Sequence, residues 1–295
     1  MNAIHAFQPI YAIAGFAVGM LVGMTGVGGG SLMTPVLILL FGIHPATAVG
    51  TDLLYAAVTK TAGSVVHGFN RTVDWAVVGR LAAGSVPMTV LTIIALSYVD
   101  INGVAARELI AGVLTVALFV TALTLIFRDK IIGRYAARIG SLAPKRIAAI
   151  TVGVGAVLGV LVSISSVGAG AIGVTALILL YPKLPTARIV GSDIAHAVPL
   201  TLVAGIGHWF LGSINLDVLA SLLLGSVPGI VLGSYAAARI PEFALRIVLA
   251  AALVVVATKL SLGFFPSSTN VIAQTLLPVD PASVQVGPGL PSGMP

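Results

Sequence analysis

The chain has 295 residues, of which 58% are apolar and only 8% are charged. A soluble domain carries roughly 25% charged residues, so this composition excludes a soluble protein and indicates one embedded in a membrane. The net charge of +6 does not indicate nucleic-acid binding, because six of the fifteen basic residues lie in one hydrophilic segment between Arg128 and Arg146. Basic clusters beside membrane spans are typical of cytoplasmic loops.

The first two apolar segments, about 9–25 and 34–43, are separated by the glycine-rich stretch GMTGVGGGSLMTP from Gly23 to Pro35. One helix over both would be ~50 Å long, which is too long for a single ordinary crossing. We therefore expect a helix hairpin with a break between its two arms. Three apolar segments long enough to cross the membrane follow, over 45–69, 74–99 and 105–127.

Placing the chain on itself at a shift of about 140 residues reveals two similar halves. The sequence GTDLL from Gly50 matches GSDIA from Gly191, and GSVPM from Gly84 matches GSVPG from Gly225. The glycines of the first hairpin also match those of a second one, in the pairs Gly15 and Gly155, Gly19 and Gly159, Gly28 and Gly168, and Gly30 and Gly170. Matches spread so widely and in the same order predict a duplicated unit.

We predict a first transmembrane repeat over 9–127, a basic cytoplasmic linker over 128–146 and a second transmembrane repeat over 147–264. The remaining tail, 265–295, is rich in proline, glycine and serine, and we expect it to be disordered and external. If each hairpin returns to the side on which it began, the repeats are inverted, and 12 basic residues lie inside against 2 outside. If each hairpin makes one crossing, the repeats are parallel and the count is 9 against 5. The positive-inside rule favours inversion.

The predicted fold is thus an all-α polytopic membrane protein of two inverted repeats, each a broken helix hairpin followed by three transmembrane helices. Inverted repeats and broken helices are typical of secondary transporters, whose substrate site lies near the membrane midplane.

The two glycine breaks are candidates for an anion site. Thr34 and Pro35 are typical of an N-cap and a first helical residue, and the free N–H groups of such a helix start attract anions. Alternatively, the glycines only allow helices to pack closely, but a triple glycine with a repeated counterpart favours binding. The predicted substrate-binding residues at the breaks are Thr25, Gly26, Gly28, Gly29, Gly30, Ser31, Thr34, Ser165, Ser166, Gly168 and Gly170.

Four ionisable residues lie inside predicted spans, where a function is the first interpretation to consider. We predict that Lys60 binds the substrate anion; alternatively it forms a structural pair with Asp52 or Asp193. The two aspartates match each other in the repeats and either carry a proton or hold the hairpin breaks. His196 follows Asp193 by three residues on the same helical face, so the pair is a candidate proton relay; alternatively His196 is a structural core histidine. We expect no metal site and no cofactor, since no ligand set or phosphate-binding loop is present in the sequence.

The stretches GMTGVGGGSLMTPVLIL, HPATAVGTDLL, HGFNRTVDW, VGSDIAHAVPL and GSVPGIVLGS resemble the TauE/SafE sulfite exporter family, and the similarity extends over essentially 10–262. This resemblance implies a multi-pass protein of the bacterial inner membrane that exports sulfur-containing anions such as sulfite or organosulfonates. We expect an ion-coupled secondary transporter whose partners are that anion and the lipid bilayer, with no nucleic acid; a homo-oligomer is compatible with the sequence. A passive anion channel and an intramembrane enzyme using Asp193 and His196 are the alternatives, and the repeats favour transport over catalysis.

Overall fold

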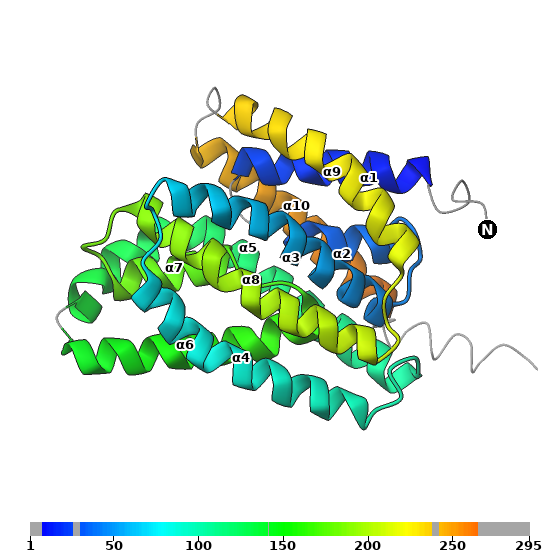
Figure 1. The fold of residues 1–295 in the computed structure, drawn as a ribbon, viewed down its shortest axis with the longest axis horizontal. Helices are drawn as coiled ribbons and strands as arrows, with labels where there is room; N and C mark the ends of the chain where they lie inside the picture. Colours follow the sequence, from blue (N-terminus) through cyan, green and yellow to red (C-terminus); the bar gives the residue numbers. More distant parts are fainter. Residues whose placement is uncertain (1–7, 26–29, 141, 238–241, 265–295) are drawn as a thin grey trace, which may run out of the picture.

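The computed structural model describes residues 8–25, 30–140, 142–237 and 242–264. These residues form ten helices and no strand (Figure 1). In chain order the helices are α1 (Pro9–Thr25), α2 (Gly30–Leu39), α3 (Pro45–Phe69), α4 (Trp75–Ser97), α5 (Val104–Gly140), α6 (Pro144–Ser165), α7 (Ala171–Leu180), α8 (Thr186–Phe210), α9 (Leu216–Ala237) and α10 (Glu242–Phe264).

Six of the helices in the described ranges, namely α4, α5, α6, α8, α9 and α10, are long and apolar enough to cross a membrane. Helices α1 and α7 are apolar but shorter. Helix α3 has 25 residues and is not among the six, because Asp52, Lys60 and several threonines lower its hydropathy. The prediction of an all-helical multi-pass membrane protein is confirmed.

The predicted spans 45–69 and 74–99 correspond closely to α3 and α4. The third predicted span, 105–127, is shorter than the helix that contains it, because α5 continues to Gly140 through most of the segment 128–146. At 37 residues, α5 is about 55 Å long and so exceeds the thickness of the hydrocarbon core. Much of the expected linker is therefore the C-terminal part of a helix.

The helix break of the second hairpin lies where the glycines predict it. Helix α6 ends at Ser165, α7 begins at Ala171, and Ser166, Gly168 and Gly170 between them all have positive φ, at 58°, 120° and 118°. Positive φ is strained for most side chains and tolerated by glycine, which explains the glycines at two of these positions. In the first hairpin α1 ends at Thr25 and α2 begins at Gly30.

The prediction that Thr34 is an N-cap and Pro35 the first helical residue is wrong, because α2 begins at Gly30 and contains Pro35. A Thr-Pro pair is a local signal for a helix start. In the folded chain, however, both the N–H and the hydroxyl of Thr34 donate to Asp52 of α3. This contact between helices allows α2 to begin one turn earlier.

Helices α3 and α8 pack against each other in the middle of the bundle, flanked by the pair α1 and α9 on one side and the pair α4 and α6 on the other (Figure 1). The start of α3 meets the end of α8, since a Cβ atom on Gly50 would strike His208 and Ser213. The end of α3 meets the start of α8, since a Cβ atom on Gly191 would strike Thr72 and lie 3.0 Å from Nδ1 of His67. The two central helices therefore run antiparallel.

Contacts of the first half recur in the second at the shift of about 140 residues. The Asp74 N–H donates to Ser192 Oγ at 2.8 Å, and the Asn215 N–H donates to Thr51 Oγ1 at 3.1 Å. Within each half a histidine Nδ1 meets a hydroxyl five residues later, at 2.8 Å for His67 with Thr72 and 2.9 Å for His208 with Ser213. The halves thus contact each other reciprocally.

Candidate functional site

The buried acidic and basic side chains of the described residues lie on the central pair of helices, α3 and α8. Helix α3 contributes Asp52 and Lys60, and α8 contributes Asp193 and His196, together with His208 near its end. We call the first four residues the ionic centre. Burying charges in a membrane is costly, so their gathering on one helix pair marks the first place to look for function.

Asp52 connects α3 to α2. Its Oδ2 accepts a hydrogen bond from Thr34 Oγ1 at 2.6 Å and a second from the Thr34 N–H at 3.2 Å. Ser166, from the break of the second hairpin, lies beside the same carboxylate. Its other oxygen, Oδ1, is buried and has no hydrogen-bond partner in the part of the chain that the structure describes. The carboxylate therefore touches an arm of the first hairpin and the break of the second.

Asp193 makes the corresponding connection from α8 to α7. The backbone N–H of Gly170, the N-cap residue of α7, lies beside its carboxylate. Oδ1 of Asp193 also lies against Gly173, where any Cβ atom would overlap it. A carboxylate at a helix start is stabilised by the positive end of the helix dipole. Each aspartate thus sits beside the second arm of its own hairpin.

Lys60 interacts electrostatically with both aspartates and with His196, and Asp193 has the stronger effect of the two carboxylates. The position along the helices explains this order. A Cβ atom on Gly63 would lie 3.4 Å from Ile194, so Lys60, three residues before Gly63, is level with the turn of α8 that follows Asp193. Asp52 is eight residues earlier on α3, or about 12 Å along the helix axis.

His196 is hydrogen-bonded to α4 through Nε2, which is 2.9 Å from Ser85 Oγ. Its Nδ1 has no partner among the described residues, and no direct hydrogen bond joins it to Asp193 there. The matching position on α3 is Tyr55, whose buried hydroxyl lies near Ser226 of α9. The matching residues His196 and Tyr55 thus each face a serine of a neighbouring helix.

Several buried polar atoms near the ionic centre have no hydrogen-bond partner within the described ranges: Asp52 Oδ1, Tyr55 OH, Ser166 Oγ, Asp193 Oδ1 and His196 Nδ1. Leaving one such atom unpaired costs about 1–3 kcal/mol. Buried polar groups are nearly always paired with protein groups or water, so these atoms are where a water, a ligand or a proton would bind.

Seven of the residues that the sequence singled out lie on or beside the central helix pair, with Thr34 and Ser166 beside Asp52, Gly170 beside Asp193, and Lys60 and His196 between the two carboxylates. Ser165 is used locally, since its hydroxyl donates to the Leu161 carbonyl at 2.7 Å and accepts from the Val167 N–H at 3.2 Å. Gly168 packs against Leu161. Of the other predicted residues, Gly30 begins α2, whereas Gly26, Gly28, Gly29 and the side chains of Thr25 and Ser31 lie outside the described residues.

Tyr55, Ser85, Gly173 and Ser226 were not predicted from the sequence. Tyr55 and Ser226 have no charge, and serines and glycines are common in membrane helices. The repeat contained one usable signal, because the shift that matches Asp52 with Asp193 also matches Ser85 with Ser226.

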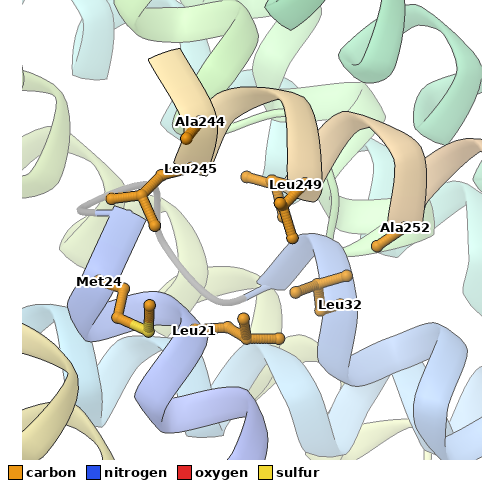
Figure 2. A pocket seen from close by; sticks show the side chains of 8 residues that line it. Leu21, Met24, Leu32, Ala244, Leu245, Leu249 and Ala252 are labelled. Atoms are coloured by element: carbon orange, nitrogen blue, oxygen red, sulfur yellow. The ribbon is translucent and has the colours of Figure 1, made fainter. Parts of the chain in front are cut away.

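A separate cavity of about 170 Å³ lies between α1, α2 and α10 (Figure 2). Its lining is entirely apolar and consists of Leu21, Met24, Leu32, Ala244, Leu245, Val248, Leu249 and Ala252. Without a polar group it offers nothing to an anion. Nor does any group of three His, Asp or Glu residues in the described ranges have the arrangement needed to hold a metal ion.

A bundle of apolar helices around a buried set of charges defines a multi-pass membrane protein with a polar interior. The chain belongs to the sulfite exporter TauE/SafE family, whose model matches residues 11–260. This confirms the family predicted from the motifs, and membership in a family of transporters favours a non-enzymatic role.

Two proteins of Bacillus subtilis (strain 168) are similar to the chain. One is named "Probable membrane transporter protein YjnA" and is 38% identical over 251 residues, which is 84% of this chain and 97% of that protein. The other, "Probable membrane transporter protein YunE", is 38% identical over 82 residues, 28% of this chain and 30% of its own length. No solved structure matches the chain. The relatives are thus bacterial proteins whose names describe membrane transporters.

Proposed function

We propose that this protein is a proton-coupled secondary transporter that exports small sulfur-containing oxyanions, such as sulfite or organosulfonates, across the bacterial inner membrane. The family description supplies the class of anion. The observation that carries the proposal is the ionic centre, in which the ammonium group of Lys60 is buried with two carboxylates beside the hairpins. A buried cation is the natural counter-charge for an anion that crosses a hydrocarbon core.

The architecture that we propose is a pair of inverted repeats, 9–127 and 147–264, joined by a cytoplasmic segment 128–146. Reciprocal contacts between the halves support a two-fold relation, because only a two-fold axis makes both partners use the same surface. The antiparallel course of α3 and α8 supports inversion, since matching helices then cross the membrane in opposite directions. The external tail, 265–295, is tested by a protease site placed within it: cleavage is expected from outside, and cleavage only from the cytoplasm contradicts inversion.

In the proposed mechanism the anion competes with Asp193 for its partners. The carboxylate lies within electrostatic range of Lys60 and beside the N–H at the start of α7. When Asp193 takes up a proton, its attraction for both partners falls, and the ammonium group and the helix end become available to an anion. Loss of the proton on the other side reverses the competition and expels the anion. Proton and anion then move in the same direction, so the outward gradient of the anion drives export when it exceeds the opposing proton gradient.

Charge balance gives a second reason for coupling. With both aspartates ionised, the ionic centre holds two negative charges against the single positive charge of Lys60. A further anion would meet net repulsion, and at short range in a medium of low dielectric constant this repulsion amounts to several kcal/mol. Uptake of one proton removes the excess, so binding of an anion and binding of a proton favour each other.

Reconstitution in proteoliposomes tests the function. We expect sulfite or an organosulfonate to accumulate against its own gradient when a pH gradient is imposed. Movement only down the anion gradient would indicate a passive channel, and chemical conversion without movement would indicate an enzyme using Asp193 and His196.

A pair of lysine variants tests the site. Lys60→Met should raise the half-saturation concentration for the anion at every pH, because the counter-charge is lost. Lys259→Met is the matched control, since Lys259 lies exposed on α10, and its transport should equal that of the unmodified protein. Equal transport by both variants would remove Lys60 from the binding site.

A further inference from the structure

The two ring nitrogens of His196 have different surroundings, although the whole side chain is buried. Nε2 is 2.9 Å from the hydroxyl oxygen of Ser85 on α4, whereas Nδ1 has no hydrogen-bond partner among the described residues. In a neutral imidazole one nitrogen carries a hydrogen and donates, and the other accepts. The position of that hydrogen therefore decides what His196 offers to the interior of the bundle.

The contact with Ser85 favours the tautomer that carries the hydrogen on Nδ1. In the part of the chain that the structure describes, the Ser85 hydroxyl has His196 as its one side-chain or backbone partner. If Nε2 is unprotonated, it accepts from this hydroxyl, and of the two hydrogens only the one on Nδ1 is left without an acceptor. If Nε2 carries the hydrogen, the Ser85 O–H and the lone pair of Nδ1 are both unpaired. The first arrangement is favoured, because each unpaired buried group costs free energy.

His196 lies close to Lys60 and to the start of α7. Lys60, three residues before Gly63, is level with the turn of α8 after Ile194, because Gly63 packs against Ile194. It is also within electrostatic range of His196. Asp193 is one turn before His196 on α8, with its carboxylate beside the first N–H of α7. Along α8, His196 is therefore between the two groups that the proposed mechanism makes available to an anion, the ammonium group and the helix end.

We propose that His196 binds the transported oxyanion as an uncharged donor through Nδ1–H, next to the ammonium group of Lys60, and that Ser85 is a positioning residue that keeps the hydrogen on Nδ1. This inference rests on the proposed function and assigns His196 to binding instead of proton transfer. An uncharged donor stabilises the oxygens of the anion without the cost of burying a second positive charge. An oxyanion has enough oxygens to accept from both groups at once.

Two amide variants separate the roles of the two nitrogens. The amide group of asparagine occupies roughly the place of Nδ1, and that of the longer glutamine roughly the place of Nε2. His196→Asn therefore keeps a donor for the anion, whereas His196→Gln keeps only the contact with Ser85. In proteoliposomes we expect the half-saturation concentration for sulfite to rise by about tenfold in His196→Gln and by less than about threefold in His196→Asn. If the glutamine variant binds sulfite as tightly as the asparagine variant, the inference is overturned and the proposed function stands.

The pH dependence of transport distinguishes a donor from a proton relay. Asp193 carries the proton in the proposed mechanism, and Lys60 and Asp52 are the other buried charges of the ionic centre. His196→Asn should therefore retain the response of flux to a pH gradient. Loss of that response in a variant that still binds sulfite would make His196 a relay and contradict the inference.

The tautomer can be observed directly in nitrogen-15 spectra of the full-length protein labelled in its five histidines. The signals of His196 are those that disappear in either amide variant. In the unmodified protein Nδ1 should be protonated and Nε2 unprotonated at neutral pH, and added sulfite should shift the Nδ1 signal. A hydrogen on Nε2, or an Nδ1 signal that saturating sulfite leaves unchanged, would overturn the inference.

Replacing Ser85 tests its positioning role. Ser85→Ala should allow both tautomers and raise the half-saturation concentration for sulfite by about threefold. The control is Thr92→Val, which removes another buried hydroxyl of α4, one that donates to the Met88 carbonyl at 2.7 Å; it should change neither the tautomer nor the affinity. An unchanged tautomer in Ser85→Ala would remove Ser85 from the proposal. Absence of sulfite and sulfonate movement through the unmodified protein would overturn the proposed function and this inference together.

Discussion

Replacing Thr34 by valine tests whether the contact between α2 and α3 is a specific hydrogen bond to a buried carboxylate. Thr34 and Asp52 are both 0% exposed, and the hydroxyl donates to Oδ2 at 2.6 Å. Valine keeps the branched shape but offers no donor, so the carboxylate loses its shorter hydrogen bond and retains the N–H at 3.2 Å. A hydrogen bond to a charged group contributes about 1.5–3 kcal/mol.

We therefore expect Thr34→Val to lower the free energy of unfolding by about 2 kcal/mol. For a chain of 295 residues, with an unfolding entropy of about 2.1 cal/mol/K per residue, such a change lowers the midpoint of thermal unfolding by roughly 3 °C. The assay is thermal unfolding of the purified protein in detergent, followed by intrinsic fluorescence. Thr34→Ser, which keeps the hydroxyl, should recover most of the loss.

A matched control and a double-mutant cycle make the measurement specific. Thr124→Val removes an exposed hydroxyl that bonds only within α5, at 2.7 Å to the Val120 carbonyl, and should change the stability by less than about 0.5 kcal/mol. Combining Thr34→Val with Asp52→Asn should cost less than the sum of the two changes, because both remove the same interaction. The reasoning would be refuted if the stability losses of Thr34→Val and Asp52→Asn added up in the double variant. It would also be refuted if Thr34→Val unfolded at the same temperature as the unmodified protein.

Three other predictions follow from single residues. Gly84→Ala should destabilise the fold by about 1–3 kcal/mol in thermal unfolding, because its Cβ would strike the backbone of Val152, whereas Gly79→Ala on the same helix meets nothing within 4 Å and should be neutral or stabilising. Gly170→Ala should lower stability by about 1–2 kcal/mol and reduce flux, because φ there is +118° beside the Asp193 carboxylate. Asp193→Asn should leave anion binding largely intact but abolish the pH dependence of flux.

Each of these three predictions has a contradicting result. Equal unfolding midpoints for Gly84→Ala and Gly79→Ala would show that α4 and α6 can separate without cost. Unchanged flux in Gly170→Ala would show that the start of α7 is not part of the transport site. A proton gradient that still drives flux through Asp193→Asn would make that aspartate structural.

Much of the fold could be predicted from the sequence, because membrane helices obey strong local rules of length and apolarity. The bounds of α3 and the break between α6 and α7 follow from such rules together with the repeat. The start of α2 and the extent of α5 could not be predicted from these rules. The first depends on a carboxylate supplied by another helix, and the second on a charged segment whose composition fits either a loop or a helix outside the membrane.

The candidate site divides in the same way. The sequence alone identifies each of the four candidate site residues, because an ionisable residue within an apolar span is rare. They are Asp52, Lys60, Asp193 and His196. Which groups face each other depends on how the two halves pack, and no local pattern encodes that. The correspondence between Tyr55 and His196 follows only from the structure, in which each side chain lies near a serine of a neighbouring helix.

The packing of α1 has a consequence for biosynthesis. Its principal partner is α9 of the other half, against which it lies so closely that a Cβ atom on Gly225 would collide with Ala12. Because α9 is translated roughly 200 residues after α1, at about 5–20 residues per second α1 waits about 10–40 s in the membrane for its partner. During this interval its glycine face needs a temporary neighbour, such as a lipid or an insertase. If translation stops after the first half, α1 stays without its partner α9, and the exposed glycine face of α1 is a feature that membrane quality control can recognise.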